Sequence, residues 1–207
     1  HRNLRERDWN VVETETLVYD MPDDIAARFG YGLYSARYGN IYTVRQMLQL
    51  LREVYGDLTP QARVWENAGR FYDAQRPSVE PDGLAKAAYV LEARGDHLSA
   101  VRKAVEQAEM FVFTLGLTET WQHQASGTVY PTAPGVIAGN FDPNDFAFHN
   151  LSYDEIMVDL RELREVLKAI NPDMTMLLTV SPVPLTATAT GRASGCRAAR
   201  CRHVAAT

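Results

Sequence analysis

The sequence predicts an α/β fold that contains a parallel sheet. Two apolar runs, residues 110–115 and 174–180, are continuous rather than alternating, as in strands that are covered on both faces. Apolar residues at helical spacing lie between them: Ile156, Leu160, Leu163 and Leu167. Two strands joined by one helix form a β-α-β unit with parallel strands and a right-handed crossover. The residues after each strand therefore lie at the carboxyl edge of the sheet, where such folds bind ligands.

Two capping boxes predict the starts of two helices. In TVRQ (residues 43–46) and SYDE (residues 152–155), a Thr or Ser is followed three residues later by a Gln or Glu, so that each side chain can cap the other residue's backbone N–H. We expect the first helix to end at Gly56 and the second to end near Ile170, because Pro172 cannot continue it.

The N-terminal segments are predicted from composition. Residues 1–8 are charged and typical of a helix end, whereas residues 9–14, WNVVET, have strand character. Residues 20–42 are rich in Gly and Tyr without a clear period, so we expect mostly loop there.

The middle of the chain alternates between irregular and helical patterns. Residues 57–83 contain three prolines and are expected to form a long irregular connection. Residues 84–108 have helical spacing, which predicts one or two helices with a break near Gly95. Residues 116–150 are rich in Gly, Pro, Asn and Asp and are expected to form a long loop.

The overall composition is that of a soluble globular protein with one domain. The chain has 207 residues, of which 46% are hydrophobic and 23% are charged, and its net charge is −5. This charge gives no general attraction to nucleic acid or to anionic membranes, and no apolar run approaches the roughly 18–20 residues that span a bilayer. We therefore expect no nucleic-acid or membrane partner and, with no visible signal peptide, a cytoplasmic location. The oligomeric state stays open.

Residues 191–207 differ in composition from residues 1–190. They contain four arginines and both cysteines but no Leu, Ile, Phe, Tyr or Trp. We expect a domain over residues 1–190 and a tail that does not fold, such as DNA translated in a shifted frame or a degenerate end. Two alternatives stay open: an Arg-rich segment that binds an acidic partner, and a metal site at Cys196, Cys201 and His203.

The stretch TLGLTETW brings polar groups to the end of the first apolar run. Gly116, Thr118 and Glu119 can present backbone N–H groups, a hydroxyl and a carboxylate to one pocket. Donors aimed at a developing oxyanion are often the largest single contribution to catalysis. A strand-to-loop turn with a helix-capping Thr or Glu explains the same residues equally well.

Gly39 and Asn40 precede the first capped helix. Glycine permits a close backbone approach, and the Asn40 amide is a neutral donor suited to an oxyanion. Taken alone, the stretch is more simply a turn in which Asn40 adopts a left-handed conformation.

Several aromatic and histidine residues are weaker candidates. His149 is a candidate general base or substrate contact, although packing of the loop onto the next helix is the simpler explanation. Trp121 and Tyr130 either line a substrate pocket or staple a loop. A solvated helix face explains His97, and a loop explains His123. No activated nucleophile and no cluster at metal-ligand spacing stand out, so no metal or other cofactor is expected.

Five motifs in order are similar to those of a known family: YSARYGNIYTVRQMLQLL, FVFTLGLTETW, YPTAPGV, FHNLSYDE and LLTVSPVPLTAT. Over residues 2–190 the chain resembles the GSCFA domain, a branch of the SGNH (GDSL-like) hydrolase superfamily. The resemblance implies a three-layer α/β/α flavodoxin-like sandwich and hydrolysis of an ester by a serine nucleophile.

The resemblance also implies roles for the two glycine loops. Gly39 and Asn40 look like the second superfamily block, whose glycine N–H contributes to the oxyanion hole. Gly116 to Glu119 sit where many SGNH enzymes have Gly-x-Asn-Asp, with Thr118 in place of the oxyanion asparagine. The long spacing between the two loops suggests an insertion at residues 57–108 with a role in substrate choice.

The same resemblance implies a fragment. The Gly-Ser-Cys-Phe-Ala motif with the nucleophilic serine is expected upstream of His1, and the Asp-x-x-His block is expected beyond LLTVSPVPLTAT. No pattern in residues 185–207 matches that block, since Arg200 stands three residues before His203. We therefore expect negligible serine-dependent hydrolysis from this chain.

The leading hypothesis is an enzyme that hydrolyses O-acyl esters, with a carbohydrate or a related polar small molecule as substrate. One alternative is a non-catalytic carbohydrate- or metabolite-binding module, which would bind without activity. The other is an acyltransferase with a sugar hydroxyl as acceptor, which product analysis separates from hydrolysis. A metal-dependent enzyme has the least support.

Overall fold

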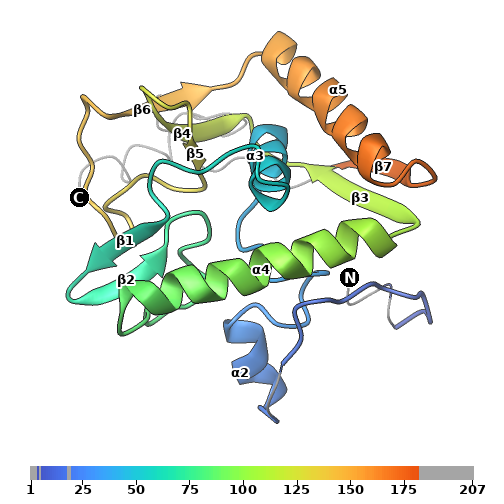
Figure 1. The fold of residues 1–207 in the computed structure, drawn as a ribbon, viewed down its shortest axis with the longest axis horizontal. Helices are drawn as coiled ribbons and strands as arrows, with labels where there is room; N and C mark the ends of the chain where they lie inside the picture. The colour runs from blue at the N-terminus through green and yellow to red at the C-terminus, as the bar shows by residue number, and fades with distance from the viewer. Residues whose placement is uncertain (1–3, 5, 18–19, 182–207) are drawn as a thin grey trace, which may run out of the picture.

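The computed structural model describes residues 4, 6–17 and 20–181, and it confirms an α/β fold (Figure 1). Part of the helix end predicted at residues 1–8, the end of the motif LLTVSPVPLTAT and the whole tail at 191–207 lie outside the described residues. The elements in chain order are α2 (Asp23–Arg28), α3 (Val44–Val54), β1 (Val64–Asn67), β2 (Arg70–Asp73), α4 (Ala87–Gln107), β3 (Met110–Leu115), β4 (Glu119–His123), β5 (Val129–Tyr130), β6 (Phe146–Asn150), α5 (Tyr153–Ile170) and β7 (Thr175–Val180).

The predicted β-α-β unit is present. β3 and β7 pair in parallel, from Met110 opposite Thr175 to Leu115 opposite Val180, and α5 leads into β7. Just past the strand ends, the Ser181 amide donates to the Leu115 carbonyl over 2.9 Å. Both strands therefore end at the same edge, beside the residues that follow β3.

Both predicted capping boxes are confirmed. The Thr43 hydroxyl accepts from the Gln46 amide at the start of α3, and the Ser152 hydroxyl accepts from the Glu155 amide at the start of α5. In each box the side chain at the third helical position also accepts from the capping residue's N–H. These local signals place the starts of both helices at the carboxyl edge of β3 and β7.

Two segments predicted to be irregular contain strands, so those predictions were wrong. Within residues 57–83, β1 and β2 form an antiparallel hairpin whose turn residues Ala68 and Gly69 have φ of 49° and 74°. Positive φ at both central residues is typical of a type I′ turn, for which Asn-Gly is the usual signal. Within residues 116–150, β4 pairs antiparallel with β5 and with β6, which gives a three-stranded sheet in the order β5-β4-β6.

The N-terminal predictions were also wrong in part. Residues 9–14 belong to no strand of the described structure, and the segment is instead attached through Thr14. The Thr14 amide donates to the Ser35 carbonyl over 2.9 Å, and its hydroxyl donates to the Ala100 carbonyl over 2.7 Å. The loop predicted at residues 20–42 contains the short helix α2, which starts after Pro22.

No break interrupts α4, which runs through Gly95 as one helix of 21 residues. Gly95 is exposed, and a Cβ at this position would meet no atom within 4 Å.

We expect Gly95→Ala to stabilise the domain by about 0.5–1 kcal/mol, because alanine loses less backbone entropy in a helix. Urea denaturation measures this change. Gly56→Ala is the matched control and should destabilise, because Gly56 has open space but a φ of +85°.

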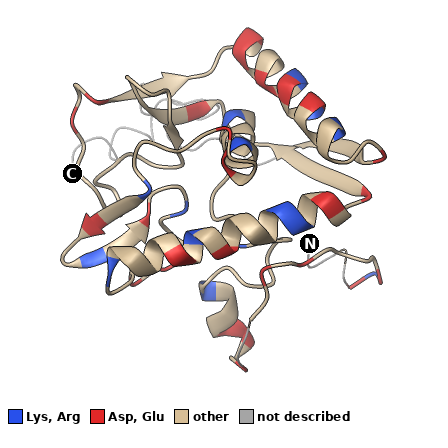
Figure 2. Cartoon of the chain, viewed as in Figure 1, with Lys and Arg blue, Asp and Glu red and all other residues tan. Residues whose placement is uncertain are grey.

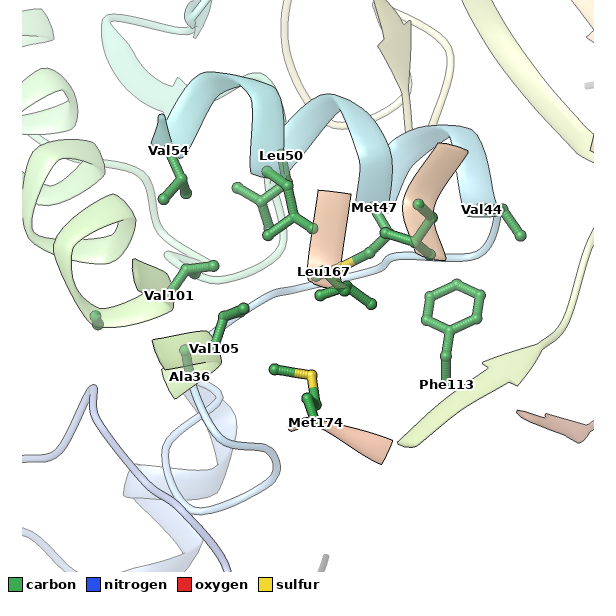
Figure 3. Packing of buried hydrophobic residues seen from close by; sticks show 13 residues of the cluster. Ala36, Val44, Met47, Leu50, Val54, Val101, Val105, Phe113, Leu167 and Met174 are labelled. Carbon is green, nitrogen blue, oxygen red and sulfur yellow. The ribbon is translucent and has the colours of Figure 1, made fainter. Parts of the chain in front are cut away.

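The main core surrounds α3. Figure 3 shows Met47, Leu50 and Val54 of α3 directed toward side chains of α4, α5 and β3. Leu51 on α3, Val101 on α4 and Leu163 on α5 are fully buried: their exposed fraction is 0%. Burial of this apolar face is the main reason that α3 packs between the two longer helices (Figure 1).

A second, aromatic core joins the hairpin to the three-stranded sheet. Trp65 of β1 stacks on Tyr130 of β5 with 5.1 Å between ring centroids. The other buried members are Tyr72, Ala74 and Ala138. The insertion between the two glycine loops thus packs against the sheet rather than extending into solvent.

Charged residues of both signs alternate along α4 and α5 (Figure 2). Arg52 of α3 pairs with Glu162 of α5, and Arg45 of α3 reaches Asp159 of α5 with 2.9 Å between Nε and Oδ2. These pairs fix the face that α3 presents to α5. Within the described chain, no helix combines the length and the apolar character that crossing a membrane requires.

Candidate functional site

The two glycine loops meet at the carboxyl edge of β3. The Leu117 amide donates to the Tyr42 carbonyl over 3.1 Å. This bond joins the turn after β3 to the segment that leads into α3. Asn40, Gly116 and Thr118 are all exposed at this edge. The structure therefore brings together residues 39–43 and 116–118, which are 73 positions or more apart in the sequence.

Thr118 is anchored to the end of β6. Its hydroxyl donates to the Asn150 side-chain oxygen over 2.6 Å, and its carbonyl accepts from the Leu151 amide over 2.8 Å. Glu119 begins β4 and lies opposite Asn150. Because the Thr118 hydroxyl hydrogen is already engaged, an oxyanion at this edge would rely on Asn40 and on backbone N–H groups.

Gly39 is required by geometry as well as by conformation. Its φ is +68°, and a Cβ added to it would lie 2.8 Å from the Arg76 Cβ and 3.3 Å from the Arg76 Cα. The loop before α3 therefore packs directly on the backbone of the insertion. Asn40 differs, because only its carbonyl takes part in a described hydrogen bond, accepting from the Gln46 side chain over 3.4 Å. Among the residues that the structure describes, the Asn40 amide N–H groups have no hydrogen-bond acceptor.

We expect Gly39→Ala to destabilise the domain by about 1–3 kcal/mol, since the new methyl group adds a steric contact to an unfavourable φ. Gly116→Ala is the control. A Cβ at Gly116 would lie 3.5 Å from the Tyr42 carbonyl, which is an ordinary contact. Urea denaturation of both variants compares them, and equal losses at the two positions would contradict a packing role for Gly39.

His149 lies at the end of β6, next to Asn150. Its Nε2 is 2.7 Å from Oε1 of Glu155 on the first turn of α5. Hydrogen bonds lower the pKa of Glu155 to about 2: the bond from the Ser152 backbone has the largest effect, and the bond from His149 has the next largest. The loop is thus held onto the helix, as the simpler explanation proposed, but through a carboxylate rather than through apolar packing.

Trp121 and Tyr130 lie opposite each other on β4 and β5. Tyr130 is fully buried, and its hydroxyl accepts from the Ala62 amide over 3.2 Å. Trp121 is partly buried and contacts the edges of Phe141 and Phe148. Among the described residues, their ring contacts lie within and around the aromatic core and not with the glycine loops.

The prediction for His97 was wrong. It is not on a solvated face but is buried, with an exposed fraction of 1%. Its Nδ1 is 2.7 Å from Glu15 Oε2, which also accepts from the Arg37 amide over 2.8 Å. Arg76 donates to Glu15 Oε1 over 3.0 Å and to the Arg37 carbonyl over 2.9 Å. Both polar groups of the Arg37 backbone are therefore held by buried charges two residues before Gly39.

Burial and neighbouring charges shift the pKa values of Glu15, Tyr38 and His97, which lie behind the Gly39 loop. Burial and the charge of Arg76 lower the pKa of His97 to about 4, against the opposing effect of Glu15. Burial opposes ionisation of Glu15, but His97, Arg76 and the Arg37 amide outweigh it and lower its pKa to about 2. Burial, together with the charge of Glu15, raises the pKa of Tyr38 to about 12. At neutral pH this layer contains an ionised Glu15, a neutral His97 and a neutral Tyr38.

These residues carry little signal in the sequence. Glu15, Arg76 and His97 come from three separate segments, and no local spacing links them. Asn150 was visible only as a neighbour of His149, and Glu155 only as a helix-capping residue. Across the part of the chain that the structure describes, no group of three or more His, Cys, Asp or Glu is placed to hold a metal ion.

Comparison with known protein families decides the affiliation of the chain. The model of the GSCFA family matches residues 2–202. The chain belongs to the GSCFA family. The match extends past residue 190, where the motifs had led us to expect its end. Searches of curated proteins and of solved structures found no match. The family model covers both the loop at residues 39–43 and the loop at residues 116–118. In this GSCFA domain the two loops are joined by the hydrogen bond between Leu117 and Tyr42.

Proposed function

We propose that this GSCFA domain belongs to a serine ester hydrolase of the SGNH type that cleaves O-acyl esters of carbohydrates or related polar molecules. The observation that carries the proposal is the hydrogen bond from the Leu117 amide to the Tyr42 carbonyl. It places a glycine-containing turn at the carboxyl edge of a parallel strand beside a second glycine loop. Sites for acyl transfer need several donors converging on one oxygen, and such an edge can supply them.

The donors follow from the local geometry. The Asn40 amide is exposed and its N–H groups have no partner among the described residues, so it is the side-chain donor best placed to bind an oxyanion. Gly39 and Gly116 are candidates to add backbone N–H groups. Thr118 holds Asn150 and supports the turn rather than replacing the missing asparagine as a donor.

The reaction would follow acyl-enzyme logic. A serine, expected in the Gly-Ser-Cys-Phe-Ala motif, attacks the ester carbonyl while a base takes its proton, and the donors stabilise the tetrahedral oxyanion. The alcohol leaves, and water releases the acid. The proposal includes a three-layer flavodoxin-like sandwich, to which the β3-α5-β7 unit would belong. It also includes a cytoplasmic location without nucleic-acid or membrane partners, in keeping with the net charge of −5.

The test uses the product of the complete reading frame that contains this chain. Acetate release is measured from a panel of O-acetylated mono- and oligosaccharides, with and without a serine-reactive phosphonate. We expect Asn40→Ala to lower kcat by about 10²–10³-fold, as for other oxyanion donors. Asn144→Ala, at an exposed loop position, is the matched control and should leave kcat unchanged.

Other outcomes would support the alternatives. Calorimetric binding of an acetylated sugar without acetate release would indicate a binding module. Transfer of the acetyl group to an added sugar, seen by mass spectrometry, would indicate an acyltransferase. Release of acetate that phosphonate does not inhibit would contradict the serine mechanism.

A further inference from the structure

A small cavity lies beside the segment that leads into α3. Its volume is about 20 Å³, and the residues that line it include Tyr38, Ile41, Leu50, Gln75 and His97. A buried water molecule needs roughly 10–15 Å³ of such space and two to four polar partners. The cavity therefore has room for one water molecule, and its polar side chains decide whether a water molecule can bind there.

Hydrogen bonds fix the orientation of the Gln75 amide at this cavity. Gln49 accepts from the Val129 amide through Oε1 over 2.8 Å and donates to the Val129 carbonyl through Nε2 over 3.0 Å. The Gln49 amide cannot be turned by 180° without losing both bonds, because the two backbone groups have fixed roles. Gln49 Nε2 also donates to Gln75 Oε1 over 2.8 Å. The Gln75 oxygen is therefore the acceptor in this contact, and the Gln75 N–H groups need another partner.

That partner is not supplied by the protein groups that the structure describes. Of the buried side-chain nitrogen and oxygen atoms in the described residues, only Gln75 Nε2 has no hydrogen-bond partner. A buried donor without an acceptor is costly, and native proteins commonly satisfy such a group with a bound water molecule. The unpartnered donor and the cavity are separate observations, and both point to the same side chain.

His97 supplies an acceptor on the wall of the same cavity. Although burial opposes it, His97 and Arg76 lower the pKa of Glu15 to about 2, so Glu15 is ionised and can only accept. The 2.7 Å contact between Glu15 Oε2 and His97 Nδ1 then requires the proton on Nδ1. His97 is neutral at pH 7, because burial and the charge of Arg76 lower its pKa to about 4. Its lone pair is therefore on Nε2, to which no described residue is hydrogen-bonded.

Tyr38 can act as a third partner. Its ring meets the edge of the His97 ring with 5.9 Å between centroids. Burial, together with the charge of Glu15, raises the pKa of Tyr38 to about 12, so its hydroxyl keeps the proton at neutral pH. A hydroxyl can donate or accept a hydrogen bond. With Gln75 and His97, the wall of the cavity thus offers three polar partners, the number typical of a buried water molecule.

A neutral ligand fits these groups better than an ion does. Arg94 also lines the cavity, but its charge is already paired with Glu53 and Asp73. A cation would face the N–H groups of Gln75, and an anion would face the lone pair of His97 Nε2. Water can accept from the first group and donate to the second.

We propose that one water molecule occupies this cavity, where it accepts a hydrogen bond from Gln75 Nε2 and donates one to His97 Nε2. The water joins α4 to the segment after β2, on the inner side of the loop that carries Gly39 and Asn40. The inference is independent of the proposed ester hydrolysis, because it concerns contacts inside the domain alone.

The first experiment measures NOEs between water and the 207-residue chain. We expect cross-peaks from the water signal to the Gln75 side-chain amide and to the Leu50 methyl groups, and rotating-frame spectra distinguish them from proton exchange by their sign. Leu163 is the internal control and should give no cross-peak, because it is fully buried and does not line the cavity. The absence of cross-peaks at both Gln75 and Leu50 would overturn the inference. The Leu50 cross-peak should persist in Tyr38→Phe, which removes an exchanging hydroxyl, and its loss there would overturn the inference too.

The second experiment reads the ring nitrogens of His97 in two-bond ¹⁵N–¹H correlation spectra, with His97→Gln to assign the signals. We expect the Nδ1–H form, with the Nε2 resonance shifted to lower frequency by the hydrogen bond from water. Gln75→Met should reverse this shift and remove the Leu50 cross-peak, whereas Gln107→Met, at an exposed position at the end of α4, is the matched control and should change neither. An Nε2–H form of His97 in the wild type, or a Leu50 cross-peak that survives in Gln75→Met, would overturn the inference.

Discussion

Replacing Arg94 with methionine is expected to destabilise the domain by about 3–5 kcal/mol, the typical cost of removing one partner of a buried charge pair. Arg94 lies on α4 with an exposed side-chain fraction of 4%, and its partners Glu53 and Asp73 are exposed by 5% and 9%. Its guanidinium donates to both Glu53 oxygens and reaches Asp73 Oδ2 at 3.1 Å. Without Arg94, the carboxylates of Glu53 and Asp73 stay buried but lose one of the cations that neutralise them.

The protonation of Asp73 explains why the loss is large. Burial opposes its ionisation, but the charges of Arg94 and Arg76 outweigh burial and lower the pKa of Asp73. Asp73 and Glu53 in turn raise the pKa of Arg94 against the effect of burial. The two arginines therefore keep the buried Asp73 ionised, and methionine fills the volume of the arginine stem without supplying the charge.

Urea denaturation at pH 7 measures the effect, and two further variants make it decisive. Arg164→Met removes an exposed partner of Glu165 and should cost less than about 1 kcal/mol. Glu53→Gln combined with Arg94→Met removes one of the stranded charges and should recover part of the stability. A loss for Arg94→Met no larger than that for Arg164→Met would contradict a structural role for the buried charges.

The elements that the sequence predicted correctly have local signals. TVRQ and SYDE cap their own helices, and two continuous apolar runs bracket α5, so the β-α-β unit followed from short stretches of chain. The fold class needed nothing further, because parallel strands joined by a helix impose a layered arrangement. The candidate edge followed as well, since the residues after β3 must lie where the strand ends.

The elements that were missed depend on distant partners or on weak turn signals. The hairpin turn has Ala68 at a position where Asn or Gly is usual, and β5 has only two residues, which are held by β4. Gly95 lowers helix propensity, but α4 is long enough and packed well enough to continue through it. Propensity and composition describe single segments, whereas these elements are stabilised by contacts between segments.

The site shows the same division. Gly39 and Gly116 were identified from their motifs, but the contact that joins them runs through the backbone of Tyr42 and Leu117 and has no signal in side chains. The buried charges behind the Gly39 loop are even harder to predict from the sequence. Each is an ordinary charged residue in its own segment, and only the folded chain excludes water from them.

Acidification from pH 7 to pH 4 is expected to destabilise the domain, with His97 contributing on the order of 3 kcal/mol. The folded-state pKa of His97 is lowered to about 4, from an ordinary value of 6.5. The unfolded chain therefore binds a proton between these two values while the folded chain does not. The stability that His97 contributes is fully present above about pH 6.5 and is lost as the pH falls toward 4.

Most of the influences on the pKa of His97 favour this sign. Arg76 and Arg94 repel the imidazolium, and burial disfavours it, whereas Glu15 favours protonation. Glu15 has its own effect at lower pH. Its pKa is about 2 in the folded state against an ordinary 4.5, so its contribution is present above about pH 4.5 and is lost as the pH falls toward 2. The two windows adjoin, which predicts a continuous loss of stability in acid.

His97→Gln separates the two windows. Glutamine can still donate a hydrogen bond to Glu15 but cannot take up a proton, so the variant should lose most of the pH dependence between 6.5 and 4. The part below 4.5 should become smaller but not vanish, because the charge of His97 is lost while Arg76 and the Arg37 amide still lower the pKa of Glu15. Urea denaturation at half-unit steps of pH measures the slope for the wild type, for this variant and for His123→Gln, whose histidine is half-buried at the end of β4 and not in a loop as predicted. An unchanged slope in His97→Gln would show that other groups cause the acid sensitivity. A flatter dependence of stability on pH would instead confirm that His97 is buried and neutral at pH 7. His97 would then act on the proposed oxyanion loop through Glu15, which binds both His97 and the Arg37 backbone that leads into Gly39.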